Sequence, residues 1–100
     1  MKKIGLVLVM LAPLAASAQT GAVIAQKNRR FTPATVTVPR GAAITFTNDD
    51  EFIHQVYVDG LFDSAEKAPG EKLTEGFPRS GTFEVKCHIH PKMKLVVRVN

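Results

Sequence analysis

Apolar and polar residues alternate with a period of two along most of the chain after residue 20, a pattern typical of half-buried β-strands. The pattern is clear in five stretches, residues 35–38, 44–47, 54–59, 82–87 and 95–99. It is weaker at residues 22–26 and 73–77. Residues 61–72 have no clear period and are expected to form a loop, with a short strand or one helical turn as the alternatives. Short strands separated by Gly, Pro and Asn turns predict an all-β fold, a β-sandwich or a small barrel.

Residues 1–18 have the layout of a secretory signal peptide. Lys2 and Lys3 precede an apolar run at residues 4–14, and residues 16–18 offer the small side chains that signal peptidase accepts. A retained membrane anchor is the alternative, but the run is shorter than the roughly 20 apolar residues that a spanning helix needs. We expect cleavage after Ala18 and a mature domain at residues 19–100.

No pair of arginines precedes the apolar run, so the general secretion route to the periplasm of a Gram-negative bacterium is expected. Removing the signal peptide leaves 82 residues and takes away Lys2 and Lys3, so the net charge falls from +4 to +2. The mature chain has neither a basic tail nor a basic stripe with interleaved aromatic residues. These features argue against nucleic acid as a partner. No membrane span is expected in the mature domain.

The residues that can carry chemistry are concentrated in one short segment, residues 87–93, with the sequence CHIHPKM. This segment holds the only Cys of the chain, Cys87, and Met93, the only Met that remains after cleavage. It also holds two of the three His residues, His88 and His90; the third, His54, lies on a different predicted strand. A single Cys excludes disulfide frameworks and metal sites built from several thiolates.

Strand parity suggests which of these side chains point inward. In the alternating pattern, Cys87 falls on the same face of its strand as the apolar residues before it. Met93 falls on the same face as the apolar residues of the last strand, and His54 shares a face with its apolar neighbours. By the same parity His88 is expected to face the solvent. Two imidazoles, one thiolate and a weak thioether form the donor set of a blue-copper electron-transfer site. We therefore predict that His54, Cys87, His90 and Met93 bind one copper ion.

Several segments together resemble the small bacterial cupredoxins, with plastocyanin and amicyanin as the nearest types. They are residues 31–33, 41–48, 54, 62–63, 81–83 and 87–93, and the two-residue gap between His90 and Met93 is similar to that of amicyanin. The resemblance implies a Greek-key β-sandwich of seven to eight strands with copper near one end, and one-electron transfer in the periplasm. It implies the same four ligands, and it implies that Asn48 ties the two ligand-bearing loops together.

The chain departs from the family pattern beside the ligands. His88 follows the Cys where Ser or Thr is usual, Gln55 follows the first His where Asn is common, and Leu95 replaces a common Gly. These positions affect the groups that orient the ligands, and so the reduction potential, but they leave the ligand set intact.

The function expected from these residues is a non-enzymatic, monomeric electron carrier for protein redox partners such as a dehydrogenase, a cytochrome or an oxidase. A periplasmic copper chaperone or buffer protein with the same ligand set is the alternative, and a redox enzyme with an open copper site is a third class. A basic rim around the metal end would favour a partner with an acidic docking face. Its candidate residues are Arg79, Lys86, Lys92 and Lys94, and the alternative is that these are ordinary surface charges that keep the protein soluble.

Overall fold

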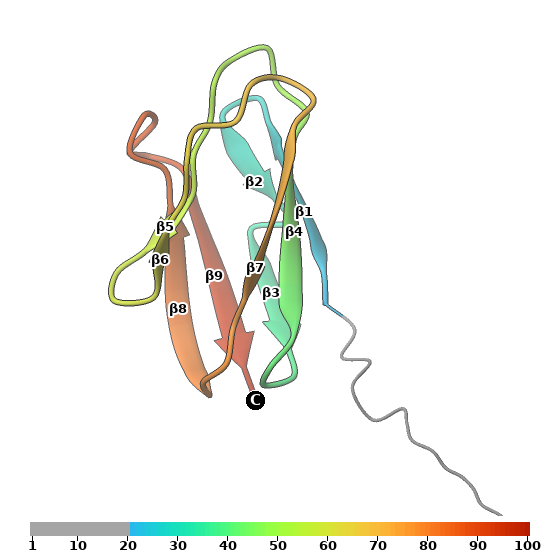
Figure 1. Ribbon diagram of the computed structural model, residues 1–100, viewed down its shortest axis with the longest axis vertical. Coiled ribbons are helices and arrows are strands. Elements are labelled where there is room, and N and C mark those ends of the chain that lie inside the picture. Colours follow the sequence, from blue (N-terminus) through green and yellow to red (C-terminus); the bar gives the residue numbers. More distant parts are fainter. Residues whose placement is uncertain (1–20) are drawn as a thin grey trace, which may run out of the picture.

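The computed structural model describes residues 21–100, so the predicted signal peptide at residues 1–18 lies outside the described residues. Within the described part the chain forms strands, turns and loops (Figure 1). No helix in this part has the length and apolar character needed to cross a membrane.

Two sheets pack face to face. The first has the order β2-β1-β4-β7, in which β2 is Arg30–Thr32, β1 is Val23–Lys27, β4 is Ala43–Asn48 and β7 is Lys72–Gly76. The second has the order β3-β9-β8-β5-β6, in which β3 is Thr35–Val38, β9 is Lys94–Val99, β8 is Gly81–Lys86, β5 is Tyr57–Val58 and β6 is Phe62–Asp63. β1 pairs with β4, and β3 with β9, in parallel; the other pairs are antiparallel.

This architecture confirms the predicted all-β sandwich, with nine strands in residues 21–100 where seven to eight were expected. Two observed strands are not among those that the alternation predicts, β6 and β2. β6, two residues at Phe62–Asp63, lies in the stretch that was expected to form a loop, with a short strand as one alternative. β2 lies outside every predicted stretch. It has three residues and follows a tight turn in which Asn28 and Arg29 both have positive φ, at 54° and 55°. Two consecutive residues in this region are typical of the hairpin turns that suit the twist of paired strands. With so few residues, β2 has too little alternation to be recognised.

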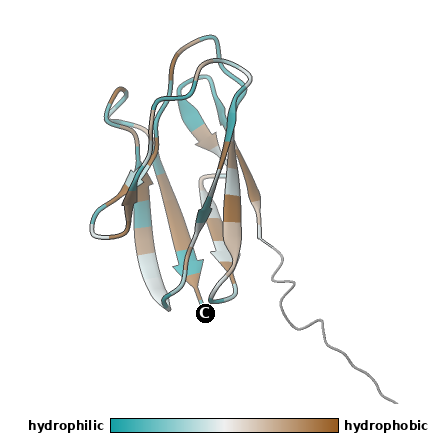
Figure 2. Ribbon diagram, in the orientation of Figure 1, coloured by the Kyte–Doolittle hydropathy of each residue, from teal (hydrophilic) through white to brown (hydrophobic). Residues whose placement is uncertain are grey.

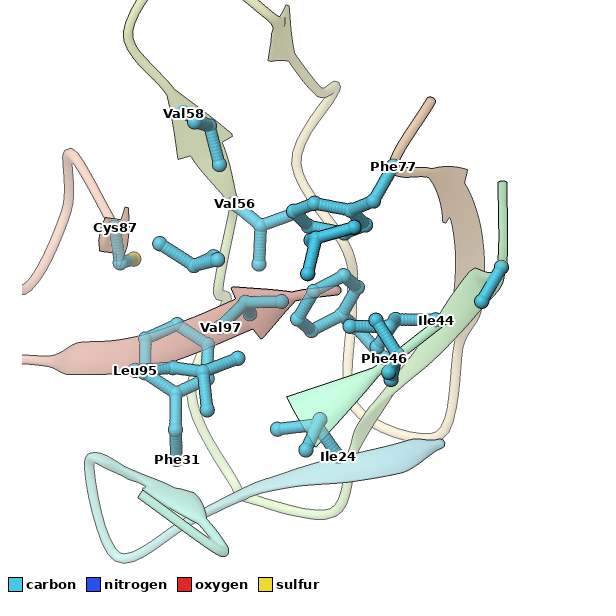
Figure 3. Packing of buried hydrophobic residues seen from close by; sticks show 14 of the residues in the cluster. Ile24, Phe31, Ile44, Phe46, Val56, Val58, Phe77, Cys87, Leu95 and Val97 are labelled. Atoms are coloured by element: carbon cyan, nitrogen blue, oxygen red, sulfur yellow. The ribbon is translucent and has the colours of Figure 1, made fainter. Parts of the chain in front are cut away.

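The core lies between the sheets and consists mainly of apolar side chains (Figure 3). Hydrophobic residues recur along the strands in Figure 2, and Gln26 of β1 and Asn48 of β4 are buried polar residues among them. Ile44 and Phe46 of β4 and Leu95 and Val97 of β9 are all fully buried. Cys87 belongs to the same buried cluster but lies at one edge of it in Figure 3. The alternation read from the sequence therefore places the thiol in the core, as expected.

The strands bring three loops to one end of the sandwich, opposite the C-terminus in Figure 1. One loop follows β4 and contains His54, one lies between β6 and β7 and contains Lys67, and the third joins β8 to β9 and contains Cys87 and His90. Backbone hydrogen bonds join the first two loops: the His54 amide donates to Lys67 O at 3.1 Å, and the Lys67 amide donates to His54 O at 2.7 Å.

The predicted strand at residues 54–59 is regular only at Tyr57–Val58. His54, Gln55 and Val56 are all buried, which breaks the expected alternation of inward and outward residues. Gln55 can be buried because its side-chain amide donates to Val56 O at 2.8 Å and to Ser64 O at 3.2 Å. These bonds replace the water that an outward Gln would contact.

Candidate metal centre

Three of the four predicted ligands meet at the loop end of the sandwich. His54, Cys87 and His90 each offer one donor atom, and these atoms all lie within 4.8 Å of one another. The rings of His54 and His90 have their centroids 4.8 Å apart at an interplanar angle of 60°. The side chains of His54 and Cys87 are buried at 0% and 1% exposure. Residues about thirty positions apart in the chain thus form one compact group of metal donors.

The two imidazoles share one feature, an Nδ1 atom that has no hydrogen-bond partner among the described residues. The Nδ1 atoms of both residues, His54 and His90, are also buried. A buried polar nitrogen without a partner is unfavourable unless something else binds it. Two such nitrogens beside a thiol fit a soft metal ion, and the set of two His and one Cys is positioned as in a type 1 copper site.

The other ring nitrogen of His54 is held by a carboxylate. His54 Nε2 lies 3.0 Å from Asp50 Oδ2, and both side chains are buried. Donation from Nε2 to the carboxylate leaves the lone pair on Nδ1, the tautomer that a metal ligand on Nδ1 requires. Asp50 thus orients the His54 ring, a contact that no sequence motif indicated.

Asp50 is itself oriented by backbone groups. Its Oδ2 accepts from the Arg29 amide at 2.8 Å, and its Oδ1 accepts from the Glu51 amide at 3.1 Å. Burial alone would raise the pKa of Asp50, but the Arg29 amide, the His54 ring and the Glu51 amide outweigh it and lower that pKa to about 2. Asp50 therefore stays ionised at neutral pH and keeps a fixed negative charge beside His54.

The link between the two ligand-bearing segments differs from the expected one. Asn48 was expected to tie them, but its amide donates to Phe52 O at 2.8 Å and to Lys67 O at 2.9 Å. It therefore fixes the loop after β4 and joins it to the loop before β7. The tie to the Cys87 segment comes from Gln55, whose Oε1 accepts from the His88 amide at 3.0 Å. The longer Gln side chain explains the change, since it reaches a loop on a neighbouring strand.

His90 lies at the boundary with solvent and is partly buried. Burial and the positive charges of His54 and Arg29 lower its pKa, and Asp50 opposes them. A neutral imidazole is the form that binds metal, so this direction favours a ligand role. The ring packs edge-on against Phe52 at 6.1 Å, and the Arg29 guanidinium lies 4.0 Å above the Phe52 ring.

Met93 and His88 follow the parity expected for each. Met93 is 2% exposed and belongs to the core cluster, and its amide donates to His90 O at 2.9 Å, which closes a turn.

His88 faces outward, as predicted; its ring stacks on Tyr57 at 3.7 Å and its Nε2 lies 3.3 Å from Asp63 Oδ2. Its side chain is 54% exposed. His88 thus lies outside the donor group, although it is next to Cys87 in the chain.

The predicted basic rim is partly wrong. Arg79 lies in the turn before β8, next to the C-terminus and far from the loop end (Figure 1). Lys86 and Lys94 are close to the loop end, but both lie within 4.0 Å of the Glu84 carboxylate, so their charge is partly balanced. Of the four residues predicted for the basic rim, Lys92 is therefore the one that still fits that role.

Two arginines that the sequence pattern did not single out join Lys92 at the loop end. Arg29 and Arg30 line a groove of about 500 Å³ together with His90, Met93 and Lys92. Their side chains reach the ligand loop because the hairpin between β1 and β2 turns back at this end of the sandwich. The groove also has an apolar part formed by Ile89 and Pro91, and Ile89 is 40% exposed.

Comparison with known proteins agrees with this geometry. A family model described as a cupredoxin-like domain matches residues 3–97. The chain is 32% identical over 81 residues to a chloroplastic plastocyanin from Tetradesmus obliquus, an alignment that covers 69% of this chain and 56% of the plastocyanin. The chain thus spans about half the length of that curated relative.

Solved structures share the fold at low sequence identity. A purple cupredoxin from Nitrosopumilus maritimus has a TM-score of 0.74 at 23% identity, covering 79% of this chain and 99% of that one. An amicyanin variant in its reduced Cu(I) form has a TM-score of 0.74 at 23% identity, covering 89% and 92%. A Cu-containing nitrite reductase from Thermus scotoductus SA-01 also matches, with a TM-score of 0.74 at 24% identity, but this chain covers 25% of that enzyme. A family match over nearly the whole sequence and a shared two-sheet architecture show that the chain belongs to the cupredoxin-like family.

Proposed function

We propose that this protein is a type 1 blue copper protein that carries single electrons between protein partners. In this proposal His54, Cys87 and His90 would hold the copper ion, and the Met93 thioether would be a fourth, weak donor. The observation that carries the proposal is the convergence of one thiol and two imidazoles within 4.8 Å, with both Nδ1 atoms buried and without a partner. A trigonal set of two His and one Cys with a weak axial Met is the arrangement used for electron transfer.

Copper bound by these donors would supply a one-electron couple between Cu(I) and Cu(II). The protein residues around the donors hold them still: Asp50 fixes the His54 ring, and Gln55 fixes the backbone that follows Cys87. A ligand set held in this way changes little between oxidation states, so little reorganisation accompanies each transfer. Burial of His54, Cys87 and Met93 also limits access of water and oxidants to the sulfur donors.

Electrons would enter and leave through His90, because its ring is the donor closest to solvent. The surrounding surface supports contact with another protein: Phe52, Ile53 and Ile89 are 39%, 46% and 40% exposed, and large exposed apolar side chains often mark interaction sites. Arg29, Arg30 and Lys92 add positive charge beside them. This surface suits a redox partner with an acidic docking face, such as a dehydrogenase, a cytochrome or an oxidase.

The burial of the donors favours a carrier over a copper chaperone or buffer protein, because metal transfer between proteins needs accessible ligands. A redox enzyme needs an open coordination position, and the buried Met93 beside His90 argues against one. We further propose that the mature protein comprises residues 19–100, is a monomer, and works in the periplasm after general secretion. The layout of residues 1–18 supports the cleavage and the export.

The site is tested by adding Cu(II) to the purified, metal-free mature protein. We expect an intense blue band from thiolate-to-copper charge transfer, which is absent in Cys87→Ser. His88→Ala is the matched control, because His88 lies in the same loop but outside the donor group. This variant should keep the band, since the hydrogen bond of residue 88 to Gln55 uses the backbone amide. A wild-type protein that binds copper without the band would contradict the type 1 assignment.

The carrier role is tested by stopped-flow mixing of the reduced, copper-loaded protein with an oxidised c-type cytochrome. Fast and reversible electron exchange with retention of copper is expected. Loss of copper to a chelator on the same timescale, with slow electron exchange, would instead indicate a chaperone or buffer protein.

A further inference from the structure

A buried lysine, Lys67, lies opposite the predicted ligand His54 and has no assigned role. Lys67 is 4% exposed, and its Nζ atom is buried without a hydrogen-bond partner among residues 21–100. Lysine is almost never fully buried unless it is paired, because removing an ammonium group from water is unfavourable. The position of this group therefore needs a physical reason.

The backbone directs this side chain toward the metal centre. Lys67 pairs with His54 in an isolated antiparallel bridge, with hydrogen bonds of 3.1 Å and 2.7 Å in the two directions. Residues directly opposite each other in such a pair project their side chains from the same face. The His54 ring projects into the donor group, so the Lys67 side chain starts on that same buried side. Asn48 fixes the pair further, because its amide donates to Lys67 O at 2.9 Å.

The negative charge that acts most strongly on Lys67 is that of Cys87. Burial lowers the pKa of Lys67 below its usual value, while the negative charges of Cys87 and then of Glu71 raise it. Glu71 is exposed, and its Oε1 atom accepts from the Ala68 amide at 2.7 Å, so solvent and a backbone bond already satisfy it. Cys87, by contrast, is buried, and it carries a negative charge once a metal holds it as a thiolate.

We propose that Lys67 is a built-in positive charge that raises the reduction potential of the metal centre. This inference rests on the proposed copper site. Oxidised copper with two neutral imidazoles and one thiolate carries a net charge of +1, and the same set with reduced copper carries none. A nearby buried ammonium group therefore destabilises the oxidised form more than the reduced form. The step involves one electron from the partner and no change in bonds or protons.

The test replaces the charge and keeps the shape. Lys67→Met has a similar unbranched stem and no charge, and Lys67→Gln is a polar, uncharged second variant should the first fail to fold. Lys72→Met is the matched control, because Lys72 is exposed on β7 and water screens its charge. The readout is the midpoint potential of each copper-loaded protein, measured by spectroelectrochemistry on the blue band.

We expect Lys67→Met and Lys67→Gln to lower the potential and Lys72→Met to leave it near that of the wild type. The expected change is at least about tenfold in the ratio of Cu(I) to Cu(II) affinity, which for one electron corresponds to about 59 mV. The metal-free Lys67→Met protein should also unfold at a higher urea concentration than the wild type, because the cost of burying an unpaired amine is removed. Lys67→Arg, which keeps the charge, should restore most of the potential.

A blue Lys67→Met protein with the wild-type potential would overturn the inference and leave the copper site standing, and Lys67 would then be a structural residue that fills space. Absence of the blue band in the wild type would instead remove the proposed function on which the inference depends. The two failures are therefore distinguished by the first spectrum recorded.

Discussion

At the scale of single residues, the two imidazoles are asymmetric in how the protein holds them. The Nε2 atom of His54 is bound to a buried carboxylate, and the ring of His90 is held by an edge-on contact with Phe52. The first arrangement fixes both the tautomer and the ring orientation, whereas the second fixes orientation alone. The buried His54 is thus rigidly held, and the partly buried His90 is on the side from which a partner would approach.

Asp50→Asn is expected to loosen this anchor. The substitution removes the charge while keeping the size, so the His54 ring should lose its preference for the tautomer with a free Nδ1, and copper affinity should fall by about tenfold. Competition titration with a chelator measures this affinity. Asp49→Asn is the control, because Asp49 lies in the same turn but is exposed, and its carboxylate accepts from the Thr47 hydroxyl at 3.3 Å. Equal affinities of the two variants would contradict the role of Asp50.

The same substitution should change the stability of the metal-free protein with pH. The folded-state pKa of Asp50 is about 2, below the value of 3.8 for the free side chain, so its ionised form stabilises the fold above about pH 4. That contribution is lost as the pH falls toward 2. The difference in pKa corresponds to at most about 2.5 kcal/mol of stability. Urea unfolding should show wild type more stable than Asp50→Asn at about pH 6 and nearly equal to it at about pH 2.

At the scale of elements, the segment between His54 and β5 holds two parts of the site in register. Gln55 accepts the His88 amide on one side and donates to the backbone of its own segment on the other. The ligand loop after β8 is thereby attached to the segment that carries His54. A single buried amide side chain thus sets the distance between ligands that come from different strands.

Gln55→Leu should detach the ligand loop. The leucine fills a similar volume but leaves the His88 amide without its acceptor, which costs about 1–3 kcal/mol of stability. Copper should dissociate faster from this variant, which is measured by transfer to a chelator. Ser64→Ala is the matched control, since it removes the acceptor of the Val56 amide at 3.0 Å without touching the ligand loop. Loss of stability in both variants with unchanged copper release would show that Gln55 supports only the fold.

The strands that the sequence predicted are those whose alternation comes from one buried face. β4 and β9 bury Ile44, Phe46, Leu95 and Val97 toward the core, and a period of two follows directly. The segment at His54 breaks the pattern because the hydrogen bonds of Gln55, and not apolar character, make its burial possible. A polar residue that is buried by its partners has no signature in a hydropathy pattern.

Most of the predicted metal ligands could be recognised in the sequence because they lie close together in the chain. Cys87, His90 and Met93 lie within seven residues, so their rare side chains form a visible motif. The residues that support the donors, Asp50 and Lys67 among them, lie on other loops and meet the ligands only when the two sheets pack. Common charged residues at such distances carry no spacing signal, so the structure was needed to find them.

At the scale of the whole molecule, the metal is expected to add to the stability of a small sandwich. Small domains bury a limited apolar area and are marginally stable, and a ligand that binds only the folded state adds to that stability. Free copper at about 100 times its dissociation constant should add about 2.7 kcal/mol. Urea unfolding under reducing conditions, with and without Cu(I), measures this increment. It should vanish in Cys87→Ala, and an unchanged wild-type midpoint would contradict specific binding to the folded state.

The distribution of charge over the molecule leads to a prediction about partners. Arg30 and Lys92 lie at the groove beside His90, whereas Arg79 lies at the opposite end of the sandwich. Reversing the charge of Arg30 and Lys92 to Glu should slow electron transfer to a c-type cytochrome of net negative charge by about tenfold or more at low ionic strength. Arg79→Glu changes the net charge as well but should have a much smaller effect. The wild-type rate should itself fall as salt shortens the Debye length from about 30 Å to about 8 Å. If Arg79→Glu slows the reaction as much per charge as the groove variants do, net charge and not the groove controls the encounter, and the docking surface around His90 must be abandoned.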